Sequence, residues 1–325
     1  MRLFAVLAAA VLAGAGQPAS AEQPYPVRPI TMVVPFAAGG PTDVMARILG
    51  QHVSATLGQQ IVVENVTGGG GSIGAARVGK AAPDGYTAVM GNLGTHAASV
   101  GLYKNLSYDP RVDFEPVMVI ASTPMVLVVR KNLPTDTLKN FIAYAAKNPG
   151  KLTFGSAGTG SSSHLTYLLF THLTKLEIQH VPYRGLSQSV NDLLSGQIDM
   201  MFDQVVSATP HILAGGVKPL TVTAPIRAAA IPNVPSSTEA GLPELQTIVW
   251  TALFVPKATP KPIVGHVNAA VDQAMRDEAV AKRMAQLGAD LPAPAERTPQ
   301  ALGNLVRTEI DKWVPLIQAA GAVGE

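Results

Sequence analysis

The chain carries one run of hydroxyl side chains that ends in a histidine, Gly160-Ser161-Ser162-Ser163-His164. The run is one residue short of the nucleophile elbow of serine hydrolases, because a histidine stands where that motif requires its second glycine. A serine beside a histidine in sequence is not thereby activated, since the geometry of the fold decides whether the ring reaches the hydroxyl. Two interpretations follow. One is a hydrolase that uses Ser161 or Ser162 with His164; the other is a helix N-terminus whose hydroxyl and N–H groups bind an oxyanion of a ligand.

A second candidate site lies in residues 32–47, for which we predict a buried strand, a small-residue loop and the first turn of a helix. Gly40 is expected to be the N-cap, with Pro41 at the first helical position, where its missing N–H has no effect. Asp43 lies in the first turn, where the helix dipole favours a carboxylate. Because no large side chain follows Phe36 in the loop, a ligand can approach the free N–H groups of that turn. The stretch therefore predicts either an anion site or an ordinary strand-to-helix turn.

Loops of this kind recur, and each joins a strand to the start of a helix. The four loops are residues 39–42, 68–72, 155–162 and 183–185. If they converge from two domains, they form an uncharged anion cage built mostly of backbone groups. Arg184 is the one basic residue that they contain.

The sequence predicts neither a cofactor nor a metal site. Residues 69–74 match the Gly-x-Gly-x-x-Gly dinucleotide fingerprint, but the acidic residue expected about 20 positions later is missing. The seven histidines show no metal-binding spacing, the aspartates are scattered, and the chain has no cysteine. A formal charge of +2 is too small and too evenly spread to indicate a nucleic-acid partner.

The first 21 residues have the features of a secretory signal peptide. Arg2 is followed by an almost wholly apolar run, and Ala19-Ser20-Ala21 is a cleavage signal directly before Glu22. The run is too short to span a membrane, and no later stretch reaches about 18 apolar residues. We therefore expect an exported, soluble protein.

Strand and helix signals alternate along the mature chain, which is typical of an α/β fold whose mainly parallel sheets are flanked by helices. Two β-rich stretches, residues 114–130 and 247–255, are not promptly followed by a helix. We interpret them as two hinge strands that cross between two domains. The predicted domains are residues 22–125 with 249–325, and residues 126–248. Two further expectations are a loop at residues 93–98 and a helix over residues 263–287.

Seven segments of the chain are similar to one known family in their residues, order and spacing. They are residues 34–43, 63–65, 68–74, 83–87, 155–164, 181–185 and 196–203, and together they extend over nearly the whole mature chain. The chain resembles the substrate-binding receptors of tripartite tricarboxylate transporters, the Bug family of periplasmic binding proteins. The resemblance implies a two-domain Venus-flytrap fold that closes on a small carboxylated ligand.

The resemblance also implies how the ligand is bound and where it goes. The carboxylate would be held largely by backbone groups and water, and the ligand would be delivered to membrane permease subunits. Matched motif by motif, the implied contacts of the first domain are Phe36, Ala38, Gly39, Gly40, Thr42 and Asp43. Those of the second domain are Ser156, Thr159, Ser161, Ser162, His164, Tyr183 and Asp203.

We therefore expect a periplasmic, monomeric binding receptor that is not an enzyme. The alternatives are the exported serine hydrolase described above and a partner protein that presents its ligand to a membrane sensor kinase. Citrate-like acids, dicarboxylates, amino acids and aromatic acids all remain possible ligands.

Overall fold

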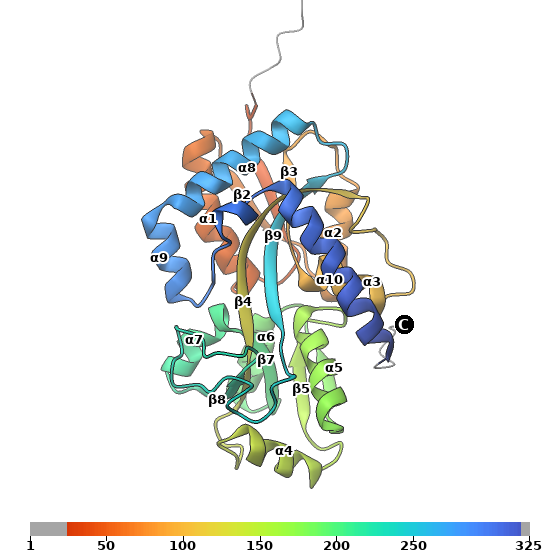
Figure 1. Cartoon of the computed structure of the whole chain (residues 1–325), viewed down its shortest axis with the longest axis vertical. Coiled ribbons are helices and arrows are strands. Elements are labelled where there is room, and N and C mark those ends of the chain that lie inside the picture. The colour runs from red at the N-terminus through yellow and green to blue at the C-terminus, as the bar shows by residue number, and fades with distance from the viewer. Residues whose placement is uncertain (1–24, 320–325) are drawn as a thin grey trace, which may run out of the picture.

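The computed structural model describes residues 25–319, which form two lobes stacked along the long axis of the molecule (Figure 1). Its strands form one nine-stranded sheet in the order β2-β1-β3-β9-β4-β7-β5-β6, and β8 pairs with β4. The sequence-based prediction of an α/β fold with two lobes joined by crossing strands is confirmed. The predicted signal peptide, residues 1–21, lies outside the described residues.

The upper lobe in Figure 1 is built on three parallel strands, β1 (Ile30–Val34), β2 (Ile61–Asn65) and β3 (Thr87–Asn92). Its helices are α1 (Pro41–Leu57), α2 (Ser72–Gly79), α3 (Ser99–Leu102), α8 (Lys261–Arg276), α9 (Glu278–Gln286) and α10 (Pro299–Ala319). Three short helical segments complete it: the 3₁₀ helices η1 (Gly69–Gly71) and η3 (Pro294–Glu296), and the π-helix η2 (Gly94–Ala98).

The lower lobe repeats this plan with the parallel strands β5 (Thr153–Ser156), β6 (Gln179–Pro182) and β7 (Met200–Gln204), and with β8 (Val217–Val222). Its helices are α4 (Leu138–Ala146), α5 (Ser162–Thr174), α6 (Leu186–Ser195) and α7 (Val205–Leu213). In each lobe the three parallel strands place their carboxyl ends at one edge, which is where α/β proteins bind ligands.

The two long strands β4 (Phe114–Arg130) and β9 (Ile248–Pro256) belong to both lobes. β4 pairs with β9 as far as Pro124, which lies opposite Ile248, and from Met125 onward it pairs with β7 and β8. The strands that pair with β4 thus change between Pro124 and Met125. Because both strands are nearly completely buried, a change in the angle between the lobes has to be absorbed at this point.

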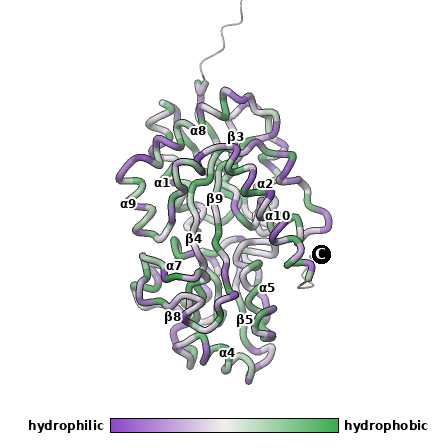
Figure 2. Tube along the Cα trace, viewed as in Figure 1, coloured by the Kyte–Doolittle hydropathy of each residue, from purple (hydrophilic) through white to green (hydrophobic). Residues whose placement is uncertain are grey.

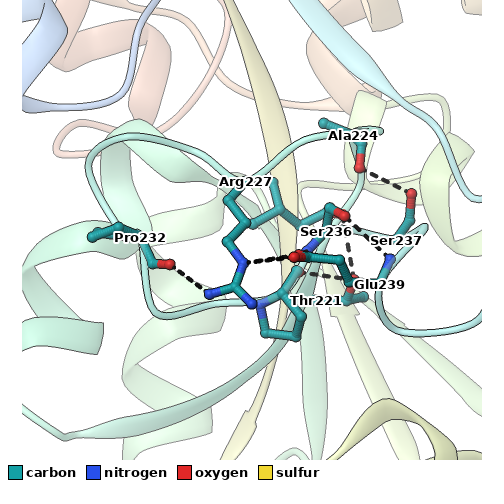
Figure 3. A network of polar contacts seen from close by, with 9 residues as sticks. Thr221, Ala224, Arg227, Pro232, Ser236, Ser237 and Glu239 are labelled. Atoms are coloured by element: carbon teal, nitrogen blue, oxygen red, sulfur yellow. Dashed lines mark hydrogen bonds and ion pairs between the residues drawn. The ribbon is translucent and has the colours of Figure 1, made fainter.

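A long connection leads from β8 back to β9, and a polar network fixes its shape (Figure 3). The guanidinium of Arg227 forms an ion pair of 2.8 Å with Glu239 and donates to the carbonyl of Pro232. Glu239 also accepts a hydrogen bond from the N–H of Ser236, and Ser237 donates to the carbonyl of Ala224. These contacts satisfy backbone groups that a long connection would otherwise leave unpaired.

The apolar core extends through both lobes instead of being divided between them. One buried cluster joins Val33 of β1 and Trp313 of α10 to Phe202 of β7, and Figure 2 shows hydrophobic residues concentrated along the strands. In another cluster Phe36 of the upper lobe packs with Leu186 of the lower lobe. The lobes therefore share apolar surface next to their facing loops.

Two expectations about local structure are wrong. Residues 93–98 are helical and not a loop, because Asn92 caps the turn: its Oδ1 accepts a hydrogen bond of 3.1 Å from the N–H of Thr95. The helix expected over residues 263–287 is two helices. Asp277 separates them, since its carboxylate accepts hydrogen bonds from the N–H groups of Ala279 and Val280 and so starts α9.

None of the helices within residues 25–319 is long and apolar enough to cross a membrane. In the same part of the chain no group of three or more His, Asp or Glu side chains is arranged to hold a metal ion.

Candidate functional site

Loops at the carboxyl ends of the parallel strands of both lobes enclose one small cavity. Its lining residues are Phe36, Gly40, Pro41, Thr42 and Asn92 from the upper lobe and Ala157, Ser161, Ser162, Ser163, Leu186 and Gln204 from the lower lobe. None of these residues carries a formal charge. The volume is about 20 Å³, which is room for a single water molecule. A small organic acid needs more room than one water molecule, so the lobes must separate to admit one.

The upper wall of the cavity is the N-terminus of α1. Gly40 is the N-cap and Pro41 the first helical residue, as the sequence predicts. Thr42 is buried in the same turn. This wall offers free N–H groups and the positive end of the helix dipole, and both favour an anion.

Asp43 shapes this wall without lining the cavity. Its carboxylate accepts hydrogen bonds of 2.9 Å from the N–H of Gly39, from Asn65 Nδ2 and from the Arg47 guanidinium. Asn65 also donates to the carbonyl of Phe36, which anchors the loop at both ends. Burial tends to raise the pKa of Asp43, but the hydrogen bond from Arg47 and those from Gly39 and Asn65 lower it overall. The carboxylate is therefore occupied in holding the loop.

The lower wall is the N-terminus of α5, where the side chains of two serines hold the loop before the helix. Ser161 is the N-cap: its Oγ accepts from the N–H of His164 and donates to the carbonyl of Gly158 at 2.7 Å. Ser163 Oγ accepts from the N–H of Ala157 at 2.9 Å. Two helix N-termini from different lobes thus point into one uncharged cavity.

Close contacts between backbones bring the two lobes together around the cavity. Ser162 Oγ accepts a hydrogen bond of 3.0 Å from the N–H of Gly94 in the other lobe. A Cβ on Gly70 would lie 2.0 Å from the carbonyl oxygen of Thr159, and one on Gly185 would lie 2.7 Å from the backbone nitrogen of Ala37. All four small-residue loops therefore meet where the lobes touch, and the lobes are closed.

The serines and histidines of the lower lobe do not form a hydrolase site. Nδ1 of His164 lies 3.4 Å from the N–H of Gly160, and its ring stacks on His180. His180 is hydrogen-bonded instead to Ser156, whose Oγ lies 2.6 Å from Nε2 and is fully buried. Burial, and then the neighbouring His180 ring, lower the pKa of His164 to about 3, and burial lowers that of His180 to about 4. Both rings are therefore neutral at pH 7 and hold the loop before α5 in place.

Tyr183 and Asp203 also lie beside the cavity and not on its surface. The Tyr183 hydroxyl donates to Asp192 at 2.6 Å, and burial together with this carboxylate raises the pKa of Tyr183. Asp203 is fully buried; its Oδ1 accepts from Ser207 and from the N–H of Gln204, whereas its Oδ2 has no partner within the described residues.

The buried Asp203 makes folding stability depend on pH in a definite direction. Burial raises the pKa of Asp203 from 3.8 to about 7, although its hydrogen bonds oppose the shift. Because the folded state binds this proton more tightly than the unfolded chain, the contribution of Asp203 to the free energy of unfolding is greatest below pH 4 and declines as pH rises to 7. The decline amounts to roughly 4 kcal/mol. We expect Asp203→Asn to gain that amount relative to wild type between pH 4 and pH 8 in urea titrations, and a difference independent of pH would contradict this.

In this closed form some of the predicted site residues line the cavity and the others do not. Phe36, Gly40, Thr42, Ser161 and Ser162 line the cavity. Ala38 and Gly39 are exposed on the loop before α1, Asp43 and Ser156 fix loops, and Thr159 lies at the contact between lobes. His164, Tyr183 and Asp203 are bound to neighbouring groups next to the cavity.

Sequence reasoning did not single out several lining residues, among them Asn92, Leu186 and Gln204. Asn92 and Gln204 are the last residues of β3 and β7. A polar residue at the carboxyl end of a parallel strand is a recognisable signal of a ligand site. Leu186, the first residue of α6, has no such signal because its pattern is that of an ordinary core position.

Comparison with known proteins agrees with this geometry. A sequence profile described as the tripartite tricarboxylate transporter family receptor matches residues 45–322. Protein BugT of Bordetella pertussis is 34% identical over 323 residues, which is 99% of this chain and 98% of BugT.

Two solved structures with bound acids have the same fold. MatC of Rhodopseudomonas palustris with bound malate is 43% identical, with a TM-score of 0.88 over 90% of this chain and 100% of that one. Rpa4515 of R. palustris with adipate is 34% identical, with a TM-score of 0.89 over 93% of this chain and 100% of that one. These relatives are solute-binding receptors and not enzymes. The chain belongs to the receptor family of tripartite tricarboxylate transporters, the Bug proteins, which are periplasmic binding proteins.

Proposed function

We propose that this chain is a periplasmic receptor that captures a small di- or tricarboxylate between its lobes and delivers it to the permease subunits of a tripartite tricarboxylate-type transporter. The observation that carries the proposal is the meeting of the α1 and α5 N-termini, one from each lobe, at an uncharged cavity. Each N-terminus can bind one carboxylate through N–H groups and its dipole. The malate-bound and adipate-bound relatives support the ligand class.

The proposed binding cycle requires the lobes to move. We assign residues 22–125 with 249–325 to one lobe and residues 126–248 to the other, with the hinge where β4 exchanges β9 for β7. The predicted signal peptide would direct the chain to the periplasm, where we expect a monomer. The family relationship supports the transporter partnership.

A panel of carboxylates tests the ligand class. We expect malate, succinate, adipate or citrate to raise the melting temperature of the refolded, ligand-free protein, because a ligand that binds only the folded state stabilises it by mass action. Calorimetric titration would then rank the binders. Small-angle scattering at saturation should show a smaller radius of gyration than the ligand-free protein. An unchanged melting temperature with all of these acids would count against the proposal.

A further inference from the structure

The side chain of Gln204 carries a buried oxygen at the cavity that accepts no hydrogen bond from the described residues. Gln204 is the last residue of β7, lies opposite Met125 on β4, lines the cavity and is 3% exposed. Its side-chain Oε1 is fully buried and has no hydrogen-bond partner among residues 25–319. Buried carbonyl oxygens are nearly always paired, so an unpaired one at a ligand site points to a group that a ligand supplies.

A second unpaired oxygen lies on the strand next to the same site. Thr251 on β9 stands opposite Asn92, another lining residue, and its Oγ1 is buried without a partner in the described part of the chain. No neighbouring serine hydroxyl donates to Gln204 Oε1 within the described residues: Ser161 donates to the carbonyl of Gly158, and Oε1 lies within hydrogen-bond distance of no donor. Two buried side-chain oxygens at or next to the site, Gln204 Oε1 and Thr251 Oγ1, therefore have no hydrogen-bond partner in the described part of the chain.

The chemistry of Oε1 limits what can bind it. An amide oxygen only accepts hydrogen bonds, and an ionised carboxylate also only accepts, so a plain dicarboxylate cannot satisfy it. A ligand that pairs with Oε1 directly must carry an O–H or N–H group. Since none of the lining residues is charged, an ammonium would be desolvated there without an anion, whereas a hydroxyl would not carry that penalty.

We propose that Gln204 Oε1 accepts a hydrogen bond from a ligand hydroxyl, so that the receptor selects hydroxycarboxylates over the same carbon skeletons without the hydroxyl. This inference rests on the proposed function and adds the feature that the ligand must have. A site built to bond a hydroxyl rejects the analogue lacking it, because the protein group is then left unpaired.

Two pairs of acids that differ only in a hydroxyl provide the test: malate with succinate, and citrate with tricarballylate. Calorimetry on the wild-type protein should give at least about tenfold tighter binding of the hydroxy acid in whichever pair binds. In Gln204→Met, which keeps the side-chain length but has no acceptor amide, that ratio should fall to within about twofold. Gln246→Met, at an exposed position, is the matched control and should leave the ratio unchanged.

Each outcome bears on the inference. Equal binding of hydroxy and unsubstituted acids by the wild type would overturn it while leaving the proposed function intact. An equal loss of both acids in Gln204→Met would also overturn it, because the amide would then be binding the carboxylate. Tighter binding of aspartate than of malate would overturn the choice of a hydroxyl over an ammonium. If no carboxylate binds, the proposed function fails and the inference fails with it.

Discussion

Gly94→Val is expected to lower the affinity for the best-binding carboxylate by at least about 100-fold, equivalent to roughly 2.7 kcal/mol. A Cβ at this position would lie 2.8 Å from the backbone nitrogen of Ser162 and 3.1 Å from the carbonyl oxygen of Gly160, both in the opposite lobe. Backbone atoms cannot move aside as the end of a flexible side chain can. The substitution therefore opposes closure directly, and calorimetric titration measures the loss.

The ligand-free Gly94→Val protein should remain folded, because the nearest atoms to the added Cβ belong to the lobe that moves away on opening. Its melting temperature should stay within a few degrees of that of the wild type. Gly265→Val is the matched control, since a Cβ on Gly265 in α8 has no neighbouring atom within 4 Å. Wild-type affinity in folded Gly94→Val would show that ligand binding does not need the closed contact.

The second large effect is expected at the N-terminus of α1. Gly40 lines the cavity. Its φ of −77° is a backbone conformation that any residue can adopt, so a larger side chain does not strain the backbone dihedrals there. Its Cβ would lie 3.3 Å from the carbonyl oxygen of Ala37, and the methyl groups of a valine would occupy a cavity of only about 20 Å³. We expect Gly40→Val to weaken binding by at least roughly 50-fold, because the carboxylate could no longer reach the N–H groups.

Arg184→Ala provides the contrast for Gly40→Val. Arg184 is exposed and does not line the cavity, although it lies within one of the four loops. Its loss should weaken binding only modestly, by about 1 kcal/mol as for a peripheral charge. If calorimetry instead finds that Arg184→Ala abolishes binding while Gly40→Val leaves it intact, a basic side chain and not the helix N-termini holds the anion.

Much of this arrangement follows from local sequence signals. Gly40-Pro41 and Ser161 are strong helix starts, and both start helices as predicted. The two long β-rich stretches are β4 and β9, because their continuous apolar runs suit strands buried on both faces. The N-termini that form the cavity walls were therefore predictable.

The composition of the cavity was less predictable, because it depends on which loops meet across the lobes. The glycines at 70, 94 and 185 look like ordinary turn or helix residues in sequence, yet each permits backbone contact between lobes. Asp43, by contrast, carries a clear sequence signal but does not line the cavity. Its position favours an anion-site role, but its carboxylate is fully used by Gly39, Arg47 and Asn65. Only the tertiary contacts separate residues that face the cavity from residues that hold its walls.

A reversible lock on the closed lobes tests the central claim most directly. A Cβ on Gly39, whose φ of +78° costs a non-glycine residue about 1–3 kcal/mol, would lie 3.9 Å from Cβ of Ser187 in the opposite lobe, close to the spacing of about 3.8 Å found in disulfides. The chain has no cysteine, so Gly39→Cys/Ser187→Cys introduces one defined pair. Calorimetric titration of the double variant, oxidised without ligand and then reduced, is the measurement. We predict that the oxidised protein binds no carboxylate and that reduction restores binding, whereas equal binding by the two forms would contradict a ligand site enclosed between the lobes.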